Sequence, residues 1–194
     1  MPVDPPPTET RPAWRSPRAA TCFGGLLLAL LAADLLLKSW AFSGAIGPDQ
    51  TIILTPRLLA LKLTLNKGAV FGMMPGFRWT FVIATFVALV VVLYFFCRSS
   101  AKHRWLHAAL ALVLAGSLGN LYDRLVWAGV RDMLWLFPGV HLPFGWNWPG
   151  GATDLYPWIF NLADAYLLVG IGFIFLRSCG APVVDPATEG GERP

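Results

Sequence analysis

Charged residues are scarce in this sequence: Asp, Glu, Lys and Arg make up 13% of its 194 residues, whereas 56% are hydrophobic. A soluble domain of this length could not bury so much apolar surface. Only three cysteines and three histidines are present, and there is no CxxC, HExxH, Walker or dinucleotide-binding motif. The composition therefore predicts a polytopic membrane protein, and the missing motifs argue against the common metal-, nucleotide- and thiol-dependent enzymes.

Four segments are apolar enough to cross a bilayer, since about 20 helical residues span a hydrocarbon core of roughly 30 Å. We place them at Ala20–Phe42, Arg78–Cys97, Arg104–Tyr122 and Trp158–Leu176. Each has a tryptophan at one end, as the aromatic belts of membrane proteins require: Trp40, Trp79, Trp105 and Trp158. We therefore expect an all-α membrane protein with four transmembrane helices, comprising residues 20–177.

Lys and Arg residues are unevenly distributed around these segments. Eight lie on the two ends of the chain and the middle loop: Arg11, Arg15, Arg18, Arg98, Lys102, Arg104, Arg177 and Arg193. Five lie on the opposite side: Arg57, Lys62, Lys67, Arg78 and Arg131. Because cytoplasmic loops carry the excess of basic residues, both termini are expected in the cytoplasm. This topology accounts for the net charge of +4, so no nucleic-acid partner is expected.

Residues 1–19 are rich in Pro, Thr and Arg and predict a disordered cytoplasmic arm, and residues 178–194 form a cytoplasmic tail. Three cysteines at predicted cytoplasmic ends of helices indicate reduced thiols without a role: Cys22, Cys97 and Cys179. His103 and His107 have the spacing of a metal pair but lack a nearby carboxylate. We therefore expect neither a metal nor another cofactor.

Two charged residues interrupt the first apolar segment. Asp34 and Lys38 stand at i,i+4 on one helix face. One interpretation is a structural ion pair in which Lys38 extends to the membrane interface. The other is that the pair orients part of a functional site.

The loop between the first two segments has the pattern of a small sheet on the outer membrane face. Leu61, Leu63 and Leu65 alternate with polar residues, which predicts a strand, and Thr51–Leu54 is a second short strand. The strand that contains Leu61, Leu63 and Leu65 runs into Asn66 and the glycines Gly68 and Gly72. A turn here would let backbone approach a ligand, with Asn66 offering both a donor and an acceptor.

The outer part of the third segment carries a polar cluster. Asn120, Asp123 and Arg124 share one helix face, so Arg124 can bridge to Asp123 or to a carboxylate from elsewhere. The alternative is a self-satisfied cluster that only locks the helix end. An ionisable side chain within a membrane costs roughly 2.5–3.5 kcal/mol on insertion scales, which favours a functional role.

Asp132 precedes the apolar run Met133–Phe137 and has no evident partner, because neighbouring Arg131 is expected to point elsewhere. Asp164 follows Asn161 by three residues at the start of the last segment. Asn161 and Asp164 could form a capping box, although Pro157 offers a helix start one turn earlier.

Two carboxylates at the outer membrane level suggest acid/base chemistry by a pair that shares one proton. The ionised member can activate water for attack on an amide, and the protonated member can donate to the oxygen and then to the leaving amine. Peptide hydrolysis by Asp132 and Asp164 fits this chemistry, because it needs no metal and no cysteine or serine nucleophile. The alternative is a proton-coupled carrier or channel, with Asp34 joining these two in a relay.

Five short blocks, in order and covering Ala20 to Leu176, resemble the lipoprotein signal peptidase (signal peptidase II) family. They are the Asp34–Lys38 pair, Asn66-x-Gly68-x-x-Phe71, Gly119-Asn120-x-x-Asp123-Arg124, Val130-x-Asp132 and Phe160-Asn161-x-Ala163-Asp164. The resemblance implies that Asp132 and Asp164 are the catalytic dyad. It also implies two supporting sets: Asn66, Gly68, Asn120, Arg124 and Asn161 line the site, and Asp34, Lys38 and Asp123 lie behind it. The sheet would correspond to the family's periplasmic cradle between the first two helices.

The resemblance further implies the substrate, a prolipoprotein whose lipobox cysteine carries a diacylglyceryl group and is cut just before that cysteine. It implies inhibition by globomycin-type cyclic peptides and a place in the bacterial cytoplasmic (inner) membrane, among lipids, with the site near the periplasmic face. We expect a monomer.

The chain departs from the family in the periplasmic loop between the third and fourth helices. Asp132 and Asn161 are separated by 29 positions, and the excess is the Pro-, Gly- and Trp-rich stretch Phe137–Trp158. One hypothesis is a lid over the dyad that lies in the membrane interface and helps exclude water. The alternative is a loop without a role.

Overall fold

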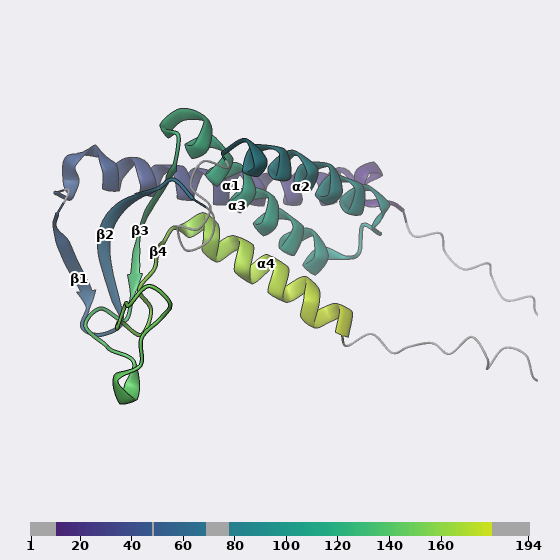
Figure 1. The fold of residues 1–194 in the computed structure, drawn as a ribbon. Coiled ribbons are helices and arrows are strands. Elements are labelled where there is room, and N and C mark those ends of the chain that lie inside the picture. The colour runs from purple at the N-terminus through teal and green to yellow at the C-terminus, as the bar shows by residue number, and fades with distance from the viewer. Residues whose placement is uncertain (1–10, 48, 69–77, 180–194) are drawn as a thin grey trace, which may run out of the picture.

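Four long helices lie side by side with a small sheet at one end in the computed structural model (Figure 1), which describes residues 11–47, 49–68 and 78–179. The helices are α1 Pro17–Trp40, α2 Arg78–Arg98, α3 Arg104–Trp127 and α4 Leu162–Cys179. Each is long and apolar enough to cross a membrane, which confirms the four predicted spans. Helix α3 is central, because α1, α2 and α4 all pack against it.

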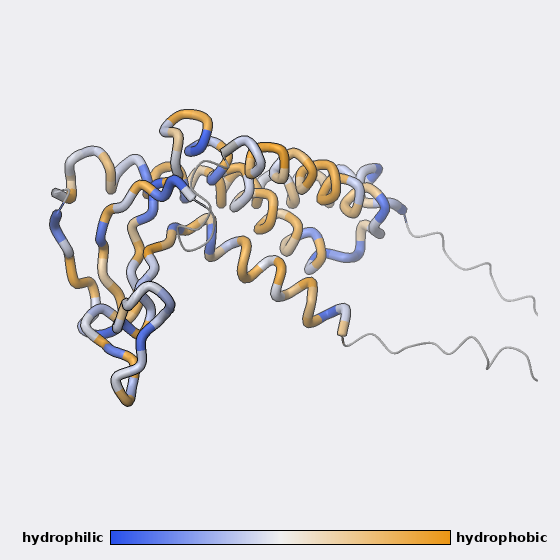
Figure 2. The backbone as a smooth tube through the Cα atoms, in the orientation of Figure 1, coloured by the Kyte–Doolittle hydropathy of each residue, from blue (hydrophilic) through white to orange (hydrophobic). Residues whose placement is uncertain are grey.

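Apolar side chains on the outer faces of the helices point away from the protein. On α2, Val87 and Val90 are exposed, and on α4 so are Val169 and Phe175. Figure 2 shows hydrophobic residues along the lengths of the helices and hydrophilic residues gathered at the two ends of the bundle. Such a surface is stable in lipid but not in water, so the helices span a membrane.

The bundle has two different ends (Figure 1). The start of α1, the turn between α2 and α3, and the end of α4 lie at one end, and the sheet lies at the other, called here the sheet end. At the former, the Ala13 amide donates to the Ser99 carbonyl (2.9 Å) and the Ala101 amide to the Arg11 carbonyl (3.0 Å). Residues 11–19 are therefore ordered, unlike the disordered arm expected there; residues 1–10 lie outside the described part of the chain.

Helix boundaries differ from the predicted ones at the sheet end. Helix α1 continues through a π-helical turn, Ala41–Ala45, that closes with Gly44 at φ 94°. Helix α3 runs to Trp127 and ends at Ala128 in the left-handed conformation, so it includes Asp123 and Arg124. Helix α4 begins at Leu162 instead of residue 158. The reason is that Ile159–Phe160 is paired in the sheet, which hydropathy does not reveal.

The sheet is antiparallel with the order β1-β2-β3-β4. Its strands are β1 Thr51–Thr55, β2 Leu59–Asn66, β3 Val130–Leu136 and β4 Ile159–Phe160. The two strands predicted between the first two helices are confirmed. The expectation that the sheet is confined to that segment is wrong, because β3 and β4 come from the connection between α3 and α4. This pairing places Thr64 opposite Asp132.

Strand β3 escaped sequence analysis because it does not alternate. Its first four residues, from Val130 to Met133, are all buried. A strand covered on both faces shows no period-2 pattern. Met133 packs with Leu61 of β2 and with Ala41 and Ile46, which lie at the end of α1 and just beyond it. The sheet is thereby fastened to the bundle on the side where the polar residues of α3 and α4 lie.

Close contact between α3 and α4 depends on glycine. A Cβ atom added at Gly170 would lie 2.8 Å from Val113 Cγ2 and 2.9 Å from the Ala109 carbonyl oxygen. We predict that Gly170→Ala lowers the thermal stability of the protein in detergent, by about 1–3 kcal/mol from overpacking. Gly172→Ala is the matched control, because no atom lies within 4 Å of its added Cβ. Equal melting temperatures for the two variants would contradict the prediction.

Candidate active site

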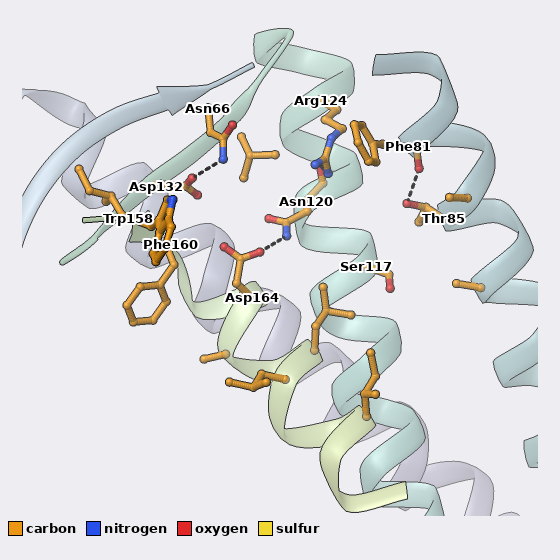
Figure 3. Close-up of a pocket in the computed structure, with 18 of the residues that line it drawn as sticks. Asn66, Phe81, Thr85, Ser117, Asn120, Arg124, Asp132, Trp158, Phe160 and Asp164 are labelled. Atoms are coloured by element: carbon orange, nitrogen blue, oxygen red, sulfur yellow. Dashed lines mark hydrogen bonds between the residues drawn. The ribbon is translucent and has the colours of Figure 1, made fainter. Parts of the chain in front are cut away.

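Two carboxylates from distant parts of the chain meet at the sheet end of the bundle. Asp132 comes from β3 and Asp164 from the first turn of α4. Asn161 Nδ2 donates to Asp132 Oδ1 (2.6 Å), and Asn120 Nδ2 donates to Asp164 Oδ1 (2.8 Å). Asn161 Nδ2 also donates to Asn120 Oδ1 (3.1 Å). Through these three hydrogen bonds, Asn120 and Asn161 join the two carboxylates in one network. Figure 3 shows both carboxylates at the same pocket.

Asn161 and Asp164 form the capping box that the sequence analysis weighed as an alternative. The Asp164 amide donates to Asn161 Oδ1 (3.0 Å), and the Asn161 amide donates to Asp164 Oδ2 (3.2 Å). The cap does not compete with a role in the site, since Asn161 uses its oxygen for the cap and its nitrogen for Asp132.

Asp132 is held from its other side by β2. Asn66 Nδ2 donates to Asp132 Oδ2 (3.1 Å), and the Gly68 amide donates to Asn66 Oδ1 (2.9 Å). Asn66 thus offers both the donor and the acceptor that the sequence suggested. Phe71 and Gly72, the other residues singled out in this motif, lie outside the described residues.

The environment of Asp132 favours its protonated form. Its side chain is 1% exposed. Burial, and next the negative charge of Asp164, raise the pKa of Asp132 from its usual 3.8 to about 7, against the opposing hydrogen bonds from Asn161 and Asn66. Near neutral pH a substantial fraction of the Asp132 carboxyl groups is therefore protonated.

Lys38 anchors the site from behind. Its Nζ lies 2.8 Å from Asp34 Oδ2 and 3.3 Å from Asp123 Oδ2, and all three side chains are 0% exposed. It also donates to Asn120 Oδ1 (3.1 Å), while Asp34 Oδ1 accepts from the Ala163 amide (3.0 Å). The predicted Asp34–Lys38 ion pair is therefore present, but Lys38 is fully buried and does not extend to the membrane interface. The pair instead links α1 to the asparagine network and to the start of α4.

Arg131 is the residue of this cluster that sequence reasoning missed. Its Nε and Nη2 donate to Asp123 Oδ1 (3.0 and 2.7 Å), and its amide donates to Asp123 Oδ2 (3.0 Å). The side chain is 3% exposed. Arg131 therefore points away from Asp132, as expected, but its pairing with Asp123 was not predicted. The sequence did signal a buried role for Arg131, since it is a charged residue beside an apolar stretch. Its partner could not be predicted, because Asp123 lies in α3 and Arg131 in β3, and helical spacing does not relate two residues in different elements.

Arg124 does not bridge to Asp123, which was one of the two kinds of partner considered for it. Its guanidinium lies over the Phe81 ring, 4.8 Å from the centroid, and Nη1 donates to the Asn120 carbonyl (3.4 Å). Asp123 is engaged by Arg131 and Lys38 instead. Arg124 consequently presents its charge to the pocket (Figure 3).

The carboxylates stand at the polar end of a cavity of about 730 Å³. The polar residues that line this end include Asn66, Asn120, Arg124, Asp132 and Asp164. The remainder runs between α2 and α4 and is mostly apolar, with Ala84 and Ala88 on one side and Leu168 and Ile171 on the other. Asp34, Lys38 and Asp123 do not line it. The cavity therefore suits a ligand with an extended apolar part and a polar reacting part.

The two histidines considered as a metal pair lie far from this cavity. His107 Nε2 is 2.8 Å from Ser99 Oγ at the opposite end of the bundle. Within the described ranges, no group of three or more His, Cys, Asp or Glu side chains could hold a metal ion.

Fold and site together define a membrane protein with paired carboxyl groups in a cavity between membrane-spanning helices. A family model described as signal peptidase (SPase) II matches residues 26–179. The chain belongs to this family, and it is an aspartic-type signal peptidase.

Curated relatives and solved structures agree with this assignment. A lipoprotein signal peptidase of Symbiobacterium thermophilum is 31% identical over 154 residues, which are 78% of this chain and 91% of the relative. One of Latilactobacillus sakei is 35% identical over 150 residues, 77% and 87% of the two chains. Two solved bacterial membrane enzymes share the fold, with TM-scores of 0.67 and 0.66, identities of 22% and 23%, and coverage of 89% and 83% of this chain and 93% and 94% of theirs. The family does not favour the alternative of a carrier.

The bonds of Arg131 lead to a prediction about stability. Arg131→Leu leaves Asp123 buried without its bidentate partner, and losing one member of a buried ion pair costs about 3–5 kcal/mol. We therefore expect a large drop in melting temperature in detergent, with Arg131→Lys intermediate. Lys62→Leu, on the neighbouring strand and exposed, is the control. A melting temperature of Arg131→Leu equal to that of the control would show that this ion pair does not stabilise the fold.

Proposed function

We propose that this chain removes signal peptides from diacylglyceryl-modified prolipoproteins, cleaving the bond before the lipidated cysteine with water activated by Asp132 and Asp164. The observation that carries the proposal is the joining of the two carboxyl groups through Asn120 and Asn161 at the polar end of an apolar cavity. The name of the curated relatives, lipoprotein signal peptidase, supports the substrate class.

The reaction uses the single proton that the pair retains. The ionised carboxylate takes a proton from water as the water oxygen attacks the scissile carbonyl carbon, and the protonated carboxyl donates its proton to the carbonyl oxygen. When the tetrahedral intermediate collapses, the C–N bond breaks and the amine leaves with the proton that the first carboxylate took from water. A hydroxyl group of the intermediate returns its proton to the other carboxylate, so the pair again holds one proton. Since the titrations are coupled, the roles of acid and base belong to the pair and not to one residue.

Other cavity residues suit the binding of substrate backbone. Arg124 presents a cation, and Asn66 and Asn120 present amides, beside the carboxylates (Figure 3). Carbonyl oxygens of an extended peptide can accept from these donors. The apolar walls on α2 and α4 would take the hydrophobic part of the signal peptide, while the acyl chains of the substrate stay in surrounding lipid.

The proposal includes an orientation. The sheet end faces the periplasm of a bacterial inner membrane and both termini face the cytoplasm, as the excess of basic residues at the termini supports. The protein acts as a monomer and is inhibited by globomycin-type cyclic peptides that occupy the same cavity.

The first test is cleavage of a diacylglyceryl-modified prolipoprotein by the purified protein in detergent. Asp132→Asn and Asp164→Asn should each lower kcat by at least about 100-fold, because acid/base groups contribute roughly 10²- to 10⁴-fold. Asp49→Asn, an exposed aspartate outside the cavity, should keep wild-type activity. Full activity in either dyad variant, or a folded wild type inactive on several lipidated substrates, would refute the proposal.

The raised pKa of Asp132 predicts a pH dependence. With the pKa near 7, the proton is present below pH 7 and is lost as the pH rises through it, so kcat/KM should fall above pH 7 and approach a tenfold loss per pH unit. The measurement is kcat/KM between pH 5 and 9 in one detergent, with folding checked at each pH. A rate that stays constant from pH 7 to 9 would exclude Asp132 as the proton holder.

A further inference from the structure

The stretch Phe137–Trp158, called here the aromatic loop, is an ordered hairpin-like loop between β3 and β4. The Leu155 amide donates to the Val140 carbonyl (2.7 Å), and the Leu142 amide donates to the Thr153 carbonyl (2.8 Å). Nearer the tip, the Trp148 amide donates to the Ala152 carbonyl (2.9 Å). These bonds tie the two halves of the loop together, so it behaves as one unit.

The base of the aromatic loop forms part of the cavity wall. Tyr156 and Trp158 line the cavity, and their rings meet edge to face with centroids 5.3 Å apart. Trp148 packs against Trp158 at 4.7 Å, and Trp135 Nε1 of β3 donates to the Tyr156 carbonyl (3.1 Å). Through this chain of contacts, the position of the loop is coupled to the wall beside the carboxylates.

The tip has the opposite character. Phe144 is 89% exposed and Trp146 is 66% exposed, and their rings lie together with centroids 6.1 Å apart. Phe144 has φ 60°, a conformation that bulky residues rarely adopt. The loop contains no Lys, Arg or Glu. Apart from Tyr156, its ionisable residues are His141 and Asp154, and His141 Nδ1 lies 3.6 Å from Asp154 Oδ1. Two aromatic rings are thus displayed on a nearly uncharged tip.

The position of the loop tip relative to the helices indicates which surroundings Phe144 and Trp146 contact. Figure 1 shows the loop at the sheet end, at the ends of β3 and β4 far from the start of α4, and extending clear of the helix bundle. The helices around it expose apolar residues to lipid, so the tip lies next to the region where the bilayer surface surrounds their outer ends. Tryptophan concentrates at such interfaces, where its ring leaves water and its indole N–H can still form a hydrogen bond. The apolar ring of Phe144 is stabilised there by leaving water.

We propose that Phe144 and Trp146 insert into the headgroup region of the bilayer, and that this contact holds the aromatic loop so that Tyr156 and Trp158 stay in place as a wall of the cavity. The occupant of the tip is the lipid surface itself, and not the substrate or a partner protein. The membrane contact is independent of the proposed function, whereas its consequence for turnover depends on that function.

Membrane contact is tested by depth-dependent fluorescence quenching in liposomes. After Cys22, Cys97 and Cys179 are replaced by serine, a bimane label is attached through Trp146→Cys, in vesicles of phosphatidylcholine and phosphatidylglycerol with and without doxyl-labelled lipids. Val90→Cys, exposed on α2, is the lipid-embedded reference, and Asp49→Cys, exposed beside β1, is the aqueous one. Quenching at residue 146 at least twofold above that at residue 49 is expected. Equal quenching at residues 146 and 49 would overturn the proposal, whatever the activity.

The coupling to the cavity is tested by turnover in two environments. The double variant F144S/W146S removes the aromatic tip and touches no cavity residue. It should cleave lipidated substrate within twofold of wild type in detergent but about fivefold more slowly in liposomes, and the aromatic-preserving double variant F144W/W146F should restore the liposome rate. An unchanged liposome rate for F144S/W146S would overturn the coupling. If the wild type cleaves nothing, the proposed function fails, and the quenching result still decides the membrane contact.

Discussion

The buried ammonium group of Lys38 is the constraint on which the arrangement of the site depends. A charged amine inside a membrane span is stable only if protein groups replace its hydration. Its partners are Asp34 on its own helix and Asp123 and Asn120 on α3. Because these requirements can be met only when α1 and α3 adopt one relative position, burying Lys38 sets the register of the two helices.

Both carboxylates are positioned through the partners of Lys38. One route runs from Asn120 to Asp164 and, through Asn161, to Asp132. The other runs from Asp123 through the bonds of Arg131, which fix β3 and therefore the neighbouring Asp132. Groups held from two directions lose little freedom when a substrate arrives, which is what a preorganised site needs. The charged residues that do not line the cavity, such as Lys38, Asp123 and Arg131, thus hold in place the residues that do line it.

Several features were readable from the sequence because each depends on neighbouring residues alone. The four helices follow from apolar length, and the first two strands follow from alternation at Leu61, Leu63 and Leu65. The capping box of Asn161 and Asp164 was underrated because Pro157 also fits a helix start, and only the pairing of Ile159–Phe160 with β3 excludes that start. Strand β3 itself was missed since both of its faces are covered.

The sequence by itself determined the membrane character, the number of spans and the set of polar residues too costly to leave unpartnered in lipid. Tertiary structure alone decided how those residues pair: Arg131 and not Arg124 with Asp123, Lys38 turned inward, and the tryptophans of the aromatic loop divided between the cavity wall and the exposed tip. The physical reason is range. Hydropathy and helical spacing act within a few residues, whereas the pairing of buried charges depends on which groups the packed helices and strands bring within about 3 Å.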